Sequence, residues 1–336
     1  MSRLSSPLVM LGLNFFLPSV VIVNVISYLG FWKFYKMLAQ IYKQNFDILK
    51  FAAFFIPSVV FWGSGIMKDT YTITAVLWFT YTVYMVFVKK QRQRTNICLL
   101  LLNAWIIIML KPYIFLALLP STFFWLSHKW TTGIKNKLMR SLVAPGLLAV
   151  GFLVSLGILS IIGNSLGRYS DADSIMKKAK ATQQDLIRGE QYGENYFDIG
   201  EYDFTPASLV SKVPAAITAG IFRPFLWEAK NIVMLISGLE NFIILLVFGI
   251  MIFRVGLIYL VGIVRSDPFL MFSFFFVIII AFSVGLTTAN FGALVRYRIP
   301  LMPFLVVLVL ELWHQKKMKS EKELQLTSSK HLDQIS

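Results

Sequence analysis

Long apolar runs separated by short, mostly basic polar segments make up this sequence. Nine apolar windows approach or exceed the roughly 20 residues that a helix needs to cross the hydrocarbon core of a bilayer. The windows cover residues 8–32, 51–67, 71–88, 97–110, 114–126, 142–162, 232–253, 269–287 and 299–313. This pattern predicts an all-α fold, a polytopic membrane helix bundle with about nine spans, some of them short or re-entrant.

Two pairs of windows are joined by only three residues each. Residues 68–70 join the second window to the third, and residues 111–113 join the fourth to the fifth. We therefore expect each pair to form a tight helical hairpin. The fourth and fifth windows are shorter than a full span, so residues 97–126 form either a re-entrant pair or one long helix broken at Pro112.

Composition and charge exclude the soluble classes. Of the 336 residues, 57% are hydrophobic and only 15% are charged, which leaves too little polar surface to coat a soluble globule. The single cysteine, Cys98, excludes an internal disulfide. We expect the first window to be a retained span and not a cleaved signal peptide, because no convincing small-residue cleavage site follows it.

The net charge of +15 is explained by loop topology. Basic residues gather in short segments between the windows, and such segments face the cytoplasm in membrane proteins. These segments are 33–50, 89–96, 127–141 and the tail from residue 314. The prediction is a multi-pass protein of the cell inner (plasma) membrane with a cytoplasmic C-terminus, and a nucleic-acid partner is not expected.

One long polar segment divides the chain. We expect membrane helices at 1–162, an extracytoplasmic loop at 163–231, further membrane helices at 232–313 and a polar cytoplasmic tail at 314–336. Within the loop, the spacing of apolar residues predicts an amphipathic helix over Asp171–Arg188 and an interfacial helix over Ala207–Leu226.

Motifs of soluble enzymes are absent. The sequence has no glycine-rich nucleotide loop and no Cys-x-x-Cys, and its three histidines fall in basic segments expected to be cytoplasmic. We therefore expect no metal site and no cofactor, although a divalent metal stays possible. Ionisable residues in or near apolar windows remain, and such residues are functional candidates because they are costly in a membrane.

Two carboxylates are the candidate catalytic residues. Asp69 follows Lys68 where the second window reaches the outer face, and Glu240 lies eight residues into the seventh window. Either carboxylate is a candidate base, and Lys68 is a candidate ligand of a lipid phosphate. The structural alternative is a charged turn at Lys68 and Asp69, and a hydrogen bond between helices at Glu240.

Three arginines are the other candidate phosphate ligands. Arg296 and Arg298 flank a tyrosine at the outer mouth of the last window, and Arg223 precedes an aromatic segment that ends at Glu228. Guanidinium groups bind phosphate bidentately, and outward arginines run against the usual charge bias. Anchoring of arginine and aromatic side chains to lipid headgroups is the alternative.

The motifs together resemble a known family. Residues 57–69 read Pro-Ser-x-x-Phe-Trp-Gly-Ser-Gly-x-x-Lys-Asp, residues 223–228 read Arg-Pro-Phe-x-Trp-Glu and lead to Leu-Glu-Asn, and residues 296–303 read Arg-Tyr-Arg-x-Pro-x-x-Pro. This combination, over roughly residues 50–305, resembles multi-pass proteins of bacterial surface-polysaccharide loci. Those proteins are similar to C-type, polyprenyl-phosphate-sugar-dependent glycosyltransferases.

The resemblance implies transfer of a sugar from a polyprenyl-phosphate carrier to a glycan or lipid acceptor at the outer face of the inner membrane. It also implies partners in envelope-glycan assembly. The usual catalytic acid of such enzymes stands in the first outer loop, and the segment before the first basic loop here has none, so Asp69 is the candidate for that place. The alternatives are an O-antigen-type polymerase of lipid-linked repeat units and a non-catalytic transporter or assembly subunit.

Overall fold

The computed structural model describes residues 2–131, 137–166 and 205–315, together with the single residues 181, 185, 197, 199, 200 and 202. Throughout these parts the chain forms helices and no strand, which confirms the all-α class there. The longer helices are α1 (Ser2–Leu11), α2 (Phe16–Ile41), α3 (Phe46–Phe54), α5 (Lys68–Val83), α6 (Gln93–Leu110), α7 (Pro112–Thr131), α8 (Lys137–Leu166), α10 (Pro206–Phe222), α11 (Ile232–Val255), α12 (Leu257–Ser266) and α13 (Pro268–Thr287). Short elements are α4 (Pro57–Gly63), the π-helical turn η1 (Tyr84–Lys89), the 3₁₀ turns η3 (Leu226–Glu228) and η4 (Ile299–Leu301), and α14 (Phe291–Tyr297).

Five helices are long and apolar enough to cross a membrane. They are α2, α5 together with η1, α6, α11 and α13. Two further candidates are bent pairs: α3 meets α4 at 44°, and α14 meets the segment Ile299–Gln315 at 40°. The chain therefore has the make-up of a membrane protein with five to seven candidate spans, and the expected count of nine is not confirmed.

Two kinds of segment account for the difference between the nine expected spans and the five to seven candidate spans. The windows at 114–126 and 142–162 correspond to shorter apolar helices, and the windows at 51–67 and 299–313 belong to the bent pairs. Apolar length alone does not register such breaks. The window search also missed α12, because its apolar stretch is short and ends at Arg265.

The first predicted hairpin turn is placed differently in the structure. Residues 68–70, expected to form the turn, are the first turn of α5, and residues 64–67 make the connection from α4. Asp69 suits this position because the N-terminal end of a helix favours a negative side chain. In the second pair, α6 and α7 are separate helices with only Lys111 between them.

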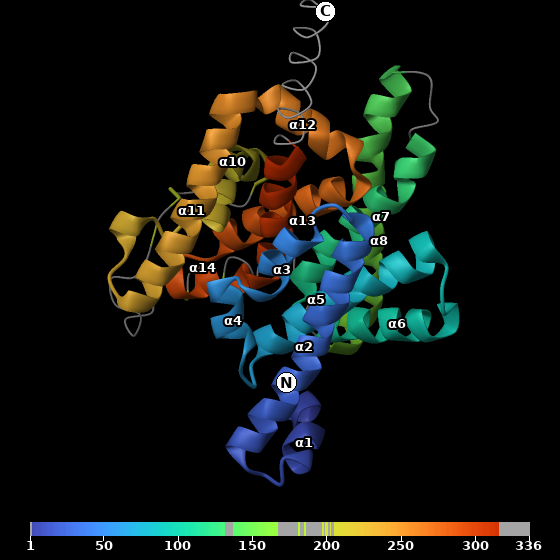
Figure 1. Cartoon of the computed structure of the whole chain (residues 1–336), viewed down its shortest axis with the longest axis vertical. Coiled ribbons are helices and arrows are strands. Elements are labelled where there is room, and N and C mark those ends of the chain that lie inside the picture. The colour runs from blue at the N-terminus through green and yellow to red at the C-terminus, as the bar shows by residue number, and fades with distance from the viewer. Residues whose placement is uncertain are drawn as a thin grey trace, which may run out of the picture.

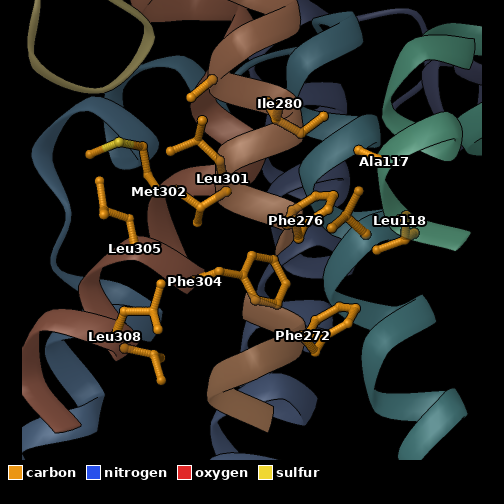
Figure 2. Packing of buried hydrophobic residues seen from close by; sticks show 14 of the residues in the cluster. Ala117, Leu118, Phe272, Phe276, Ile280, Leu301, Met302, Phe304, Leu305 and Leu308 are labelled. Atoms are coloured by element: carbon orange, nitrogen blue, oxygen red, sulfur yellow. The ribbon is translucent and has the colours of Figure 1, made fainter. Parts of the chain in front are cut away.

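Helix α13 lies near the middle of the bundle, with α10 and α11 on one side and α7 and α8 on the other (Figure 1). Two of its phenylalanines, Phe272 and Phe276, stack in parallel at the centre of the core. Phe304, from the segment Ile299–Gln315, meets both rings edge-on (Figure 2). Leu118 of α7 and Leu301 of η4 belong to the same buried cluster. Helix α1 lies outside this core and projects beyond the other helices at the bottom of Figure 1.

Helix α10 packs against α13 with backbone in contact with backbone. A Cβ atom added to Gly285 would lie 2.0 Å from the carbonyl oxygen of Ala216, and one added to Gly220 would lie 2.1 Å from that of Ala281. Small residues at a helix interface allow this close approach. The helix predicted over 207–226 corresponds to α10, which ends at Phe222. Its predicted position at the membrane interface stays a prediction.

The other features predicted for the polar segments lie outside the described residues. These are the helix over Asp171–Arg188, most of the loop at 163–204, and the tail from residue 316.

We expect Gly285→Ala to lower the free energy of unfolding by about 1–3 kcal/mol, because the new methyl group forces α10 and α13 apart. The measurement is thermal or denaturant unfolding of the purified protein in detergent. Gly249→Ala in α11 is the matched control, since its Cβ would meet nothing within 4 Å. Equal stability of the two variants would show that α10 and α13 are not packed this closely.

Candidate functional site

Asp69 is the centre of a buried ion-pair cluster. It lies in the first turn of α5 with 1% of its side chain exposed. Its Oδ1 accepts a hydrogen bond from Nζ of Lys111 at 2.5 Å, and its Oδ2 accepts one from Nε of Arg296 at 2.7 Å. A buried carboxylate is tolerated only when its oxygens are satisfied in this way. Two cations face one anion, so the cluster retains a net positive charge.

Arg296 is the most exposed of the three charged side chains in this cluster. Its side chain is 39% exposed, whereas that of Lys111 is 8% exposed. The guanidinium carbon lies 5.4 Å from the ring centre of Trp62, close enough for a cation–π contact. Nε is the guanidinium atom bound to Asp69, and the two terminal Nη groups donate to no acceptor among the described residues. Arg296 therefore presents two unused donors beside an aromatic ring.

Lys111 is the residue of this cluster that the sequence did not single out for a chemical role. It lies between α6 and α7, and its ammonium group is 5.0 Å from the ring centre of Tyr297. Burial lowers the pKa of Lys111 from its ordinary value, and the Asp69 carboxylate acts in the opposite direction by favouring the charged form. In the sequence, Lys111 stands as a single charged residue between two apolar windows and is followed by a proline, and this placement could have marked it as a candidate.

Local sequence explains how α4 and α5 meet at the site. Pro57 occupies the first turn of α4, and the residue before it is extended, so the preceding helix ends there. The connection at 64–67 is held at two carbonyls: Ser64 accepts from the Asn24 amide at 3.0 Å, and Gly65 accepts from the Thr70 hydroxyl at 2.6 Å. These hydrogen bonds fix the start of α5 and hence Asp69.

Glu240 binds the opposite end of α4. Its Oε2 accepts from the backbone N–H of Ser58 at 2.8 Å, and its Oε1 accepts from the Ser58 hydroxyl at 2.7 Å. Ser58 and Trp62 are four residues apart on α4, so they share a face and lie about 6 Å apart along the helix axis. Glu240 and Arg296 therefore contact neighbouring turns of the same short helix.

Arg298 has a different environment from Arg296, although only one residue separates them. It is fully buried, and its Nη1 donates to the carbonyls of Ile221 at 3.0 Å and Arg223 at 2.7 Å. Its Nη2 donates to the Asn241 side chain at 2.6 Å. Arg298 thus ties the end of α10 to α11, and its predicted role as a phosphate ligand stays a prediction that this geometry does not favour.

Arg223 is held among aromatic rings. Its guanidinium carbon lies 5.2 Å from the ring centre of Phe197 and 6.0 Å from that of Phe225. Its Nε pairs with Glu228 at 3.3 Å, and Phe225 stacks on Trp227 with ring centres 4.8 Å apart. These contacts hold Arg223 against neighbouring side chains, and they leave both phosphate binding and anchoring to lipid headgroups untested.

The structure therefore brings together Asp69 and Arg296, with Lys111 added, and places Glu240 one turn of α4 away. Lys68 is exposed beside Asp69 in the chain. Within the parts of the chain that the structure describes, no group of three or more His, Cys, Asp or Glu side chains is placed to hold a metal ion. The arrangement is chemically suited to binding an anion at Arg296 next to a carboxylate.

Comparisons of the chain with protein-family models, with curated proteins and with solved structures find no match. A functional proposal therefore rests on the residues of the site.

We expect Arg298→Met to lower the free energy of unfolding by about 3 kcal/mol or more, because it leaves three buried acceptors without their donor. Thermal unfolding in detergent measures this loss. Arg254→Met, at an exposed position in the last turn of α11, is the control and should change stability by no more than about 0.5 kcal/mol. If the two variants are equally stable, the buried hydrogen bonds of Arg298 do not hold this region together.

Proposed function

We propose that this protein is a glycosyltransferase-like membrane enzyme of cell-surface glycan assembly. It transfers a sugar from a polyprenyl-phosphate carrier to a glycan or lipid acceptor at the outer face of the inner membrane. The observation that carries the proposal is the partly exposed side chain of Arg296, whose two Nη groups have no acceptor among the described residues. Two parallel N–H donors fit two oxygens of a phosphate group.

The charge change during transfer favours such a site. The acceptor oxygen forms a bond to the anomeric carbon, while the bond from that carbon to the phosphate oxygen breaks. The phosphodiester, with one negative charge, becomes a phosphate monoester with close to two. A cation that binds the phosphate therefore interacts more strongly as the bond breaks, and such an interaction lowers the barrier. Arg296, with Lys68 exposed nearby, supplies this positive charge.

Of the two carboxylates, Glu240 is the better candidate for the base that takes the acceptor proton. Both oxygens of Asp69 already accept hydrogen bonds from cations, so neither is free to take a proton from an acceptor hydroxyl. Glu240 is partly exposed and accepts hydrogen bonds from Ser58, and it has no ion-pair partner among the described residues. In this assignment Asp69 orients Arg296, and Glu240 acts on the acceptor hydroxyl.

Turnover of radiolabelled polyprenyl-phosphate-linked sugars by the purified protein tests the proposal. We expect Glu240→Gln to lower kcat by about 100-fold or more, because the acceptor hydroxyl loses its base. We expect Arg296→Ala to lower kcat/KM by a similar factor, through weaker stabilisation of the leaving phosphate. Arg254→Ala, exposed at the far end of α11, should keep full activity.

Two results would contradict the proposal. Consumption of pyrophosphate-linked repeat units, with no use of monophosphate-linked sugars, would identify the polymerase alternative. Lipid binding through Arg296 with no donor consumed under any condition would identify the non-catalytic alternative. If Asp69→Asn stops transfer in a folded protein while Glu240→Gln does not, the roles of the two carboxylates are exchanged.

A further inference from the structure

The proposed function assigns no role to Lys111. Its ammonium group is buried beside Asp69, with 8% of the side chain exposed, so it is poorly placed to contact a substrate itself. A buried lysine is costly unless it is paired, and here the pairing engages only Oδ1 of Asp69. The consequence for Asp69 is that a two-bond approach of Arg296 would have to share Oδ1 with the Lys111 ammonium group, which carries the same charge as the guanidinium.

The manner in which Arg296 meets Asp69 is unusual for such a pair. Arginine commonly binds a carboxylate through two parallel hydrogen bonds, which use both carboxylate oxygens and at least one Nη group. Here the contact is single, from Nε of Arg296 to Oδ2 at 2.7 Å, while Lys111 holds Oδ1 at 2.5 Å. The Nη groups therefore take no part in the pairing and donate to no acceptor among the described residues.

We propose that Lys111 is a positioning residue for phosphate recognition: by holding Oδ1 of Asp69, it prevents a two-bond pairing with Arg296 and keeps the Nη groups available for the carrier phosphate. This inference rests on the proposed function, because it concerns the same phosphate site. Lys111 also supplies the charge that leaves the cluster net positive. Without Lys111, Arg296 and Asp69 form a neutral, closed pair.

The test measures phosphate binding and arginine accessibility, and neither requires sugar transfer. Binding of geranylgeranyl phosphate to the purified protein in detergent gives the affinity. The rate of phenylglyoxal labelling at Arg296, followed by peptide mass spectrometry, reports whether the Nη groups are accessible. We expect Lys111→Met to weaken binding by about tenfold, the effect of losing one charge-assisted hydrogen bond, and to slow the labelling of Arg296.

The double variant Asp69→Asn/Lys111→Met separates positioning from a merely structural role. It removes the carboxylate that would close on Arg296, so both affinity and labelling should be at least about threefold higher than in Lys111→Met, although the lost contact that orients Arg296 keeps them below the intact chain. Lys230→Met, an exposed lysine that follows η3, is the control and should change neither measurement. Where Lys111→Met does not fold, Lys111→Gln replaces it and should change both measurements in the same direction by a smaller factor.

Unchanged affinity and labelling in a folded Lys111→Met or Lys111→Gln protein overturns the inference. So does a folded double variant that remains as weak as Lys111→Met, and so does an intact chain that does not bind geranylgeranyl phosphate. Failure of the proposed function is distinguishable from these results. If binding depends on Lys111 as described but no sugar is transferred, the positioning role stands and the enzymatic proposal falls.

Discussion

The site depends on a carboxylate that is buried and surrounded by two cations. Asp69 joins three parts of the chain that are distant in sequence: the start of α5, the junction of α6 and α7 at Lys111, and α14 at Arg296. Removing a charge from water is costly, so the buried Asp69 and Lys111 are tolerated only where the parts of the chain that pair them meet. One interaction thus couples the geometry of the site to the assembly of the helices around it.

Helix α4 extends this organisation to the second carboxylate. It is only seven residues long, yet Ser58 binds Glu240 and Trp62 lies beside Arg296. A short helix set at 44° to the preceding one exposes backbone N–H groups at its start, and the Glu240 carboxylate satisfies one of them. The break in this apolar segment therefore has a function in the site, which a straight spanning helix would not provide.

The sequence singled out Asp69, Glu240 and Arg296, which the structure brings close to one another, but it did not predict the contacts that join them. Lys111 was missed because its partner is 42 positions away in the chain, and local pattern carries no information about such pairing. The expected nine spans are not confirmed for a related reason, since a window records how apolar a segment is and not whether its helix is broken.

Arg296 and Arg298 belong to one motif but have different environments, since Arg296 is partly exposed and Arg298 is fully buried. They lie two residues apart at the end of α14, so their side chains leave the helix in roughly opposite directions. Three neutral acceptors, two carbonyls and the Asn241 amide oxygen, bind both Nη groups of the buried Arg298, whereas its Nε has no hydrogen-bond partner among the described residues. Arg296 has one carboxylate oxygen and a ring face, with two donors left over among the described residues. In the orientation expected from the basic segments both arginines lie on the outer side, where arginine runs against the usual charge bias. For Arg298 the fold supplies most of the compensation, and for Arg296 the carrier phosphate of the proposed function would supply it.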